Sequence, residues 1–157
     1  MLRTKVLAVW AAVPVAVVVA VAGPARAGGT PEADLEYHGS AVMSGDRMDV
    51  RLVPGNHGPS AVDEASVQLR WSVPLADRQS LPDGCVRTGE RVVVCGTGAL
   101  PADGLGKPID LGVVLKDGAP EVTLEIDTAW SDGTVDANRS NDQARVLVLD
   151  TGDAYVF

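Results

Sequence analysis

A histidine and a serine stand three residues apart in the segment Asn56-His57-Gly58-Pro59-Ser60. A catalytic pair of this kind also needs an orienting carboxylate, an oxyanion hole and commonly a Gly-x-Ser-x-Gly elbow, which is absent here. Gly58 can take a positive φ, Pro59 fixes its own φ, and Asn and Ser side chains readily bond nearby backbone groups. We therefore predict a turn between two strands. No other grouping of His, Asp, Glu and Cys in the sequence supports catalysis, so we predict no catalytic residues and a protein that is not an enzyme.

Side chains with oxygen donors gather toward the C-terminal end of the chain. They are Asp132, Asp136, Asn138, Asn141 and Asp142. Calcium takes about six to eight oxygen ligands, but the spacing here is not that of an EF-hand loop. Asp and Asn also form Asx turns, and we prefer turns leading into a final strand, with a calcium site as the alternative. No cofactor is otherwise expected.

The N-terminal segment has the composition of a secretory signal peptide. Two basic residues precede an uncharged run of mainly Ala and Val at 6–22, and Pro24-Ala25-Arg26-Ala27 supplies an A-x-A cleavage pattern. The run is nearly long enough for a membrane anchor, but Pro14 and the small residues at its end favour cleavage. We predict a signal peptide at 1–27 and a single secreted, extracellular domain at 28–157, with no second apolar run to hold it in a membrane.

The charge balance excludes several classes of partner. The chain has 13 Lys and Arg against 21 Asp and Glu, a formal net charge of −8. Cleavage would remove Arg3, Lys5 and Arg26, and the three lost positive charges would leave −11. A domain this acidic is a poor partner for the phosphates of nucleic acid or for an anionic lipid surface, so we expect it to bind neither.

The only two cysteines, Cys85 and Cys95, are ten residues apart. The spacing is not the C-x-x-C of a redox pair, and a zinc site would need two more ligands, whereas the two histidines lie far away in sequence. An even number of cysteines in an exported chain predicts a disulfide. If 84–88 and 92–96 are the arms of a hairpin, a three-residue loop at 89–91 places the cysteines opposite each other, within reach of a disulfide.

Apolar residues alternate with polar ones through most of the remaining chain. The pattern predicts strands with one buried face at 47–53, 66–73 and 122–130, with shorter apolar runs at 109–115 and 144–149. Turn-forming Gly, Pro, Asp and Asn separate these runs, and no window shows a helical stripe. About seven strands in this arrangement predict an all-β, antiparallel two-sheet β-sandwich, with a closed barrel as the structural alternative.

Two tryptophans, one arginine and the two ends of the domain could each lie exposed or packed against it. Trp71 and Trp130 lie on alternating strands, so we prefer burial for both, although exposed indoles would offer a platform for stacking sugars. Arg91, at the tip of the predicted hairpin, is the one candidate for the pocket of a trypsin-like protease. We expect 28–33 and 152–157 to be frayed, unless the apolar tail at 155–157 docks.

Several short marks occur in order between residues 33 and 150. They are Ala33-Asp34-Leu35, Asn56-x-Gly58-Pro59-Ser60, Pro74 at a strand end, Cys85, Val94-Cys95, Leu100, Gly104 and Asp136-x-Asn138-x-x-Asn141-Asp142-x-Ala144. With them the chain resembles the conserved repeat domain of bacterial surface and secreted proteins, an immunoglobulin-like family of unknown function, and is similar to cell-adhesion-related bacterial domains. The resemblance implies an immunoglobulin-like fold and an extracellular setting, and it transfers no catalytic residues. The family usually has paired asparagines at 141–142 and commonly occurs as tandem copies.

These features together predict a secreted, non-enzymatic module that acts through protein–protein contacts, as a subunit or adaptor of an extracellular assembly or in adhesion. Exposed edge strands would serve as its pairing surfaces. The alternative is a carbohydrate or cell-wall binding module that uses an exposed Trp and the acidic loop. A more remote alternative is a protease inhibitor that presents Arg91 on the disulfide hairpin.

Overall fold

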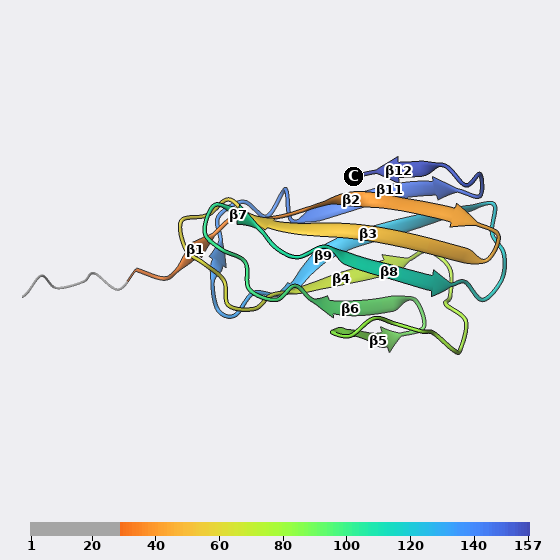
Figure 1. The fold of residues 1–157 in the computed structure, drawn as a ribbon, viewed down its shortest axis with the longest axis horizontal. Helices are drawn as coiled ribbons and strands as arrows, with labels where there is room; N and C mark the ends of the chain where they lie inside the picture. The colour runs from red at the N-terminus through yellow and green to blue at the C-terminus, as the bar shows by residue number, and fades with distance from the viewer. Residues whose placement is uncertain (1–28) are drawn as a thin grey trace, which may run out of the picture.

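The computed structural model describes residues 29–157, so the predicted signal peptide at 1–27 lies outside the described residues. The described chain is all-β, with twelve strands and no helix (Figure 1). Eight of the strands are five residues or longer, against about seven predicted. No helix in this part of the chain is long and apolar enough to cross a membrane.

Ten of the strands form two five-stranded sheets that pack face to face. The first has the order β11 (Gln143–Leu149), β9 (Glu121–Trp130), β4 (Ser66–Trp71), β6 (Val92–Gly96) and β5 (Cys85–Gly89). The second has the order β12 (Ala154–Val156), β2 (Leu35–Ser44), β3 (Arg47–Asn56) and β7 (Gly104–Leu105), with β8 (Ile109–Val114) also paired to β3. All pairs within these two sheets are antiparallel.

A third, two-stranded sheet lies at one end of the sandwich. Its strands β1 (Glu32–Ala33) and β10 (Val135–Asp136) pair in parallel. Beneath it a small buried cluster closes this end, made of Ala33, Leu35, Val62, Ala65 and Leu100. The segment at 28–33, predicted to fray, is therefore held by strand pairing from Glu32 onward.

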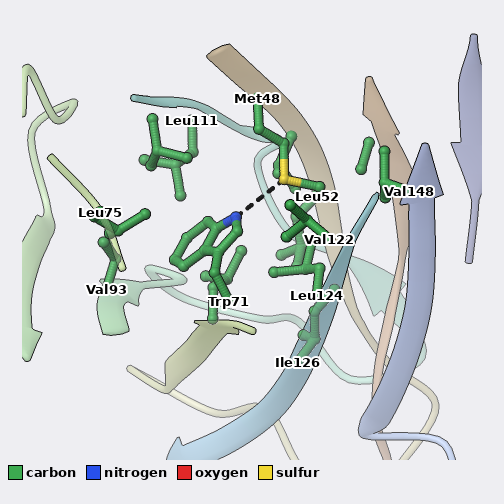
Figure 2. Packing of buried hydrophobic residues seen from close by; sticks show 14 of the residues in the cluster. Met48, Leu52, Trp71, Leu75, Val93, Leu111, Val122, Leu124, Ile126 and Val148 are labelled. Carbon is green, nitrogen blue, oxygen red and sulfur yellow. Dashed lines mark hydrogen bonds between the residues drawn. The ribbon is translucent and has the colours of Figure 1, made fainter. Parts of the chain in front are cut away.

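The main core lies between the two large sheets and follows from the alternation of the sequence. Successive side chains of a strand point to opposite faces, so every second residue of β3, β4 and β9 enters the core. The buried side chains of these strands are Met48, Val50, Leu52, Val67, Leu69, Trp71, Val122, Leu124 and Ile126. Figure 2 shows Trp71 of one sheet pointing toward Met48 of the other, with its Nε1–H donating to the sulfur at 3.1 Å.

The predicted disulfide hairpin is confirmed. Cys85 pairs with Cys95 in the register of β5 and β6, and the two are disulfide-bonded. The register slips between Arg87 and Gly89, so Gly89 pairs with Val92 and the loop has two residues where three were predicted. A disulfide indicates folding in an oxidising compartment.

The C-terminal segment at 152–157, predicted to fray, is instead docked along its last residues. β12 pairs with β2, and Phe157 continues the pairing by exchanging backbone hydrogen bonds with Gly39, each of 3.1 Å. Gly39 is required there because a Cβ would lie 2.8 Å from the Phe157 ring and still closer to the Arg51 carbonyl. The alternative we considered, docking of the apolar tail, is what occurs.

Candidate functional site

The structure separates the two residues that first suggested catalysis. The Nε2 atom of His57 lies 2.6 Å from Oε1 of Glu36, whereas the Ser60 hydroxyl accepts a hydrogen bond from the backbone N–H of Glu32. The second histidine, His38, bonds the other oxygen of the same carboxylate at 3.0 Å. Hydrogen bonding to Glu36 and its negative charge raise the pKa of His57 above its usual value. Both imidazoles therefore bind the same carboxylate, and neither is hydrogen-bonded to Ser60.

Asn56 organises the predicted turn from within. The side chain is 1% exposed, and its Oδ1 accepts from the N–H groups of Asp34 and Gly58 at 3.2 and 2.9 Å. Its Nδ2 donates to the carbonyls of Ser60 and Pro101 at 2.9 and 3.3 Å. One amide thus ties together three segments that are distant in sequence.

The reason for a glycine at position 58 differs from our prediction. Its φ is not positive, unlike that of Gly84 or Gly133. A Cβ on Gly58 would instead lie 2.4 Å from the Cα of Ala33, because the turn packs directly on the backbone of β1. Close approach of two backbones, and not a left-handed conformation, requires the glycine.

Part of the Asp and Asn loop at 132–142 makes hydrogen bonds within the loop and to the start of the domain. Asp136 accepts hydrogen bonds from the backbone N–H groups of Asn138 at 2.9 Å and Leu35 at 3.3 Å, and Asn141 Nδ2 donates to Asp34 Oδ1 at 2.8 Å. The first of these bonds is the predicted Asx turn. Asp132 lies outside this group, exposed in a tight turn with a φ of 44°.

Asp142 is the one fully buried carboxylate of this loop. The guanidinium of Arg139 lies 3.0 Å from its Oδ2 and also bonds Asp127 Oδ1 at 3.1 Å. Burial raises the pKa of Asp142, while the Thr128 hydroxyl and the Arg139 charge oppose that shift. An arginine thus supplies the positive charge beside this carboxylate. Among residues 29–157, no three His, Cys, Asp or Glu side chains are grouped as metal ligands.

The two tryptophans of the described residues differ in burial. Trp71 is 1% exposed, which confirms its predicted burial, whereas Trp130 is 50% exposed and its predicted burial is wrong. The cause is an extra residue in β9: Val67 of β4 pairs with Thr128 while Ser66 pairs with Trp130, leaving Ala129 as a bulge. A bulge shifts all following side chains to the other face of the sheet.

The outward-facing side of the β11-β9-β4-β6-β5 sheet, here called the outer face, carries aligned rows of planar polar side chains. Gln68, Asp127 and Gln143 stand side by side in one row, and Arg70, Glu125 and Arg145 in the next. Trp130 and its partner Ser66 form the row before them. Cross-strand partners share a face, so Trp130 lies at one end of this polar surface.

Two adjoining shallow depressions follow these rows. The larger, of about 470 Å³, is bordered by the side chains of both polar rows. The smaller, of about 180 Å³, is bordered by Arg70, Arg91 and Arg145 together with Ser72, Thr123 and Glu125. Side-chain amides, guanidinium groups and carboxylates can each make paired hydrogen bonds to adjacent polar groups of a ligand. This surface is therefore equipped to bind and orient a polar molecule.

The sequence analysis missed these rows because their side chains occupy outward-facing positions, where any strand with one buried face carries polar residues. The one available signal is that positions 68, 70, 125, 127, 143 and 145 all carry large Gln, Arg, Glu or Asp side chains. The pairing of β4 with β9 and of β9 with β11 aligns them, and that pairing depends on contacts distant in sequence.

The hairpin tip that was a candidate inhibitory loop is held against its own sheet. The carbonyls of Arg91 and Glu90 accept hydrogen bonds from the N–H groups of Trp71 and Leu75, at 2.9 and 2.8 Å. The Arg91 guanidinium donates to the Ser72 carbonyl at 3.0 Å. A protease would need a loop that stands clear of the body, and this tip lies along it.

Comparisons with protein-family models, with curated proteins and with solved structures find no match. The resemblance to an immunoglobulin-like bacterial family therefore stays a prediction.

Proposed function

We propose that the protein is a secreted, non-enzymatic, immunoglobulin-like module that binds glycans through its outer face. The observation that carries the proposal is the place of Trp130, which is half exposed in a row that precedes two rows of planar polar side chains on the same side of one sheet. Two packed antiparallel sheets and the ordered sequence marks support the immunoglobulin-like assignment.

A glycan fits this surface chemically. An exposed indole offers a broad apolar surface with a polar tip, suited to the apolar side of a sugar ring. Gln68 and Gln143 can each donate and accept hydrogen bonds, as sugar hydroxyls also do, and Asp127 between them accepts. Small-molecule sites commonly combine apolar contact area with a few convergent polar groups that fix orientation.

The proposal is tested by isothermal titration calorimetry with a panel of neutral and acidic oligosaccharides. We expect at least one to bind, with Trp130→Ala losing most of the affinity. Val156→Ala, which truncates the most exposed apolar side chain on the other sheet, is the matched control and should bind like the wild type. No binding across the panel, or equal binding by Trp130→Ala, would contradict the proposal.

Protein–protein contact is the second candidate function. Three exposed apolar side chains flank the same face, Val86 at 59%, Leu147 at 50% and Leu149 at 37% exposure. Such a rim would suit a protein partner. Native protein run through size exclusion, with mass spectrometry of co-eluting chains, tests this: defined partners that are lost on Leu147→Asp would favour an assembly role, and elution as a lone domain would count against it.

A further inference from the structure

We propose that the glycan is anionic and carries carboxylate groups, which Arg70, Arg91 and Arg145 hold at the smaller depression. This inference rests on the proposed function of the outer face.

Positive charge is concentrated at the smaller depression. The chain has a formal net charge of −8, yet three arginines and only one carboxylate, Glu125, border the smaller depression. The charge there is therefore opposite in sign to that of the protein as a whole. An anionic ligand would be repelled by most of the surface and attracted here, which is how charge complementarity gives specificity.

These three arginines are incompletely paired with carboxylates. Arg145 reaches Glu125 only at 3.7 Å, between its Nε and Oε1. Within the described chain neither Arg70 nor Arg91 makes an ion pair, and the Arg91 guanidinium bonds only the carbonyl of Ser72. Elsewhere Arg47 and Arg51 are bound by Asp49 and Asp110 at 2.7 and 2.8 Å. The arginines of the depression keep donors for a ligand.

The arrangement of the three guanidinium groups also suits a carboxylate. Arg70 and Arg145 flank Glu125 in one cross-strand row, and Arg91 borders the same depression from the hairpin tip. A guanidinium binds a carboxylate through two parallel N–H···O bonds, an arrangement that a single lysine amine cannot reproduce. Glu125 lies between Arg70 and Arg145 and offsets one of the three positive charges of the depression, which leaves two for an anionic ligand.

The row that holds Trp130 and the row that holds Arg70 are four residues apart along β4. At about 3.3 Å per residue they are separated by about 13 Å. A ligand that stacks on the indole and reaches the arginines must be extended and polar along its length, because Gln68, Asp127 and Gln143 lie between. An oligosaccharide with charged units offers sugar rings to the indole and carboxylates to the arginines. A peptide made of acidic residues offers only the carboxylates.

The experiment compares one oligosaccharide in two charge states. An oligogalacturonate and the same oligosaccharide with its carboxyl groups methyl-esterified differ in charge while keeping the sugar chain. We expect the wild type to bind the acid form at least about tenfold more tightly, a difference of about 1.4 kcal/mol. Arg70→Gln and Arg145→Gln should each remove most of this preference, because they should weaken binding of the acid form more than binding of the ester. Arg78→Gln, an exposed arginine outside the depression, is the control and should keep it.

The outcomes separate this inference from the proposed function. Equal binding of acid and ester forms, abolished by Trp130→Ala, would overturn the anionic ligand while leaving the glycan-binding function intact. Failure of every oligosaccharide to bind would remove the proposed function itself. Displacement of the oligogalacturonate by poly-glutamate at similar concentration would also overturn the inference, because it would show that charge alone is recognised.

Discussion

Trp130 of β9 lies directly opposite Ser66 of β4, on the face of the sheet that points away from the core. The bulged residue Ala129 separates Trp130 from the preceding part of β9, in which every second side chain points into the core. The same strand therefore supplies the core along most of its length and the candidate binding surface at its end.

This placement predicts two distinct tryptophan environments in the described domain. Acrylamide should quench part of the fluorescence strongly and leave the rest shielded, because Trp130 is half exposed and Trp71 is buried. In Trp130→Phe the accessible component should disappear and only shielded, blue-shifted emission remain. A single homogeneous quenching phase in the wild type would contradict the bulge.

The disulfide should contribute through the loop that it closes. Cys85 and Cys95 are separated by ten residues, and closing a loop of this size stabilises a folded state by about 2.5–3 kcal/mol on the chain-entropy model. We expect the double variant Cys85→Ala/Cys95→Ala to lose about that much unfolding free energy in urea. Addition of a reductant should then weaken the wild type and leave the variant unchanged; an equal response in both would argue against the bond.

Asn56 should be the most sensitive polar residue of the turn region. Asn56→Ala would leave two backbone N–H groups and two carbonyls without their partner, and we expect a loss of about 2–4 kcal/mol. Ser60→Ala removes one hydrogen bond at an exposed position and should cost less than about 1 kcal/mol. Urea unfolding of both variants measures the difference, and similar losses would refute the organising role of Asn56.

Gly58 and Gly118 provide a matched pair of substitutions. A Cβ at Gly58 meets the backbone of Ala33, and Gly58→Ala should destabilise the fold by about 1–3 kcal/mol. Nothing lies within 4 Å of a Cβ built at Gly118, so Gly118→Ala should change stability by less than about 0.5 kcal/mol. Thermal unfolding of the two variants measures the difference. A larger loss of stability in Gly118→Ala than in Gly58→Ala would contradict the prediction.

The His57–Glu36 pair predicts a pH dependence of stability. Because the pKa of His57 is raised in the folded state, the folded protein binds a proton more tightly than the unfolded chain. The added stability is present below the unfolded-state pKa and is lost as the pH rises through the folded-state pKa. Asp103, 3.8 Å from Nδ1 of His57, acts in the same direction. His57→Gln should match the wild type above that range and be less stable below it, as urea titrations at several pH values would show.

The alternation of apolar and polar residues predicted most of the fold, because within each strand it identifies the face that is buried. The runs at 47–53, 109–115 and 122–130 correspond to β3, β8 and β9, and the hairpin register followed from the spacing of the two cysteines. These features depend on residues close together in the sequence. The closed barrel did not occur, since two separate sheets pack face to face.

What the sequence could not supply depends on pairing between distant segments. Ala129 looks like any residue of an alternating strand, and only its partner in β4 reveals the bulge that exposes Trp130. The net charge likewise conceals the arginines at 70 and 145, which stand 75 positions apart and meet across Glu125. The docking of Phe157 on Gly39 is a third case, because the tail's partner strand lies more than a hundred residues earlier.

The central claim, that the outer face is the binding surface, is tested most directly by nuclear magnetic resonance. Amide resonances of the labelled protein would be followed during titration with the oligogalacturonate. The account predicts that the shifts concentrate at Trp130, Gln68, Arg70, Glu125 and Arg145. Shifts confined to the outward side of β2, β3 and β8, or none at saturating oligosaccharide, would contradict it.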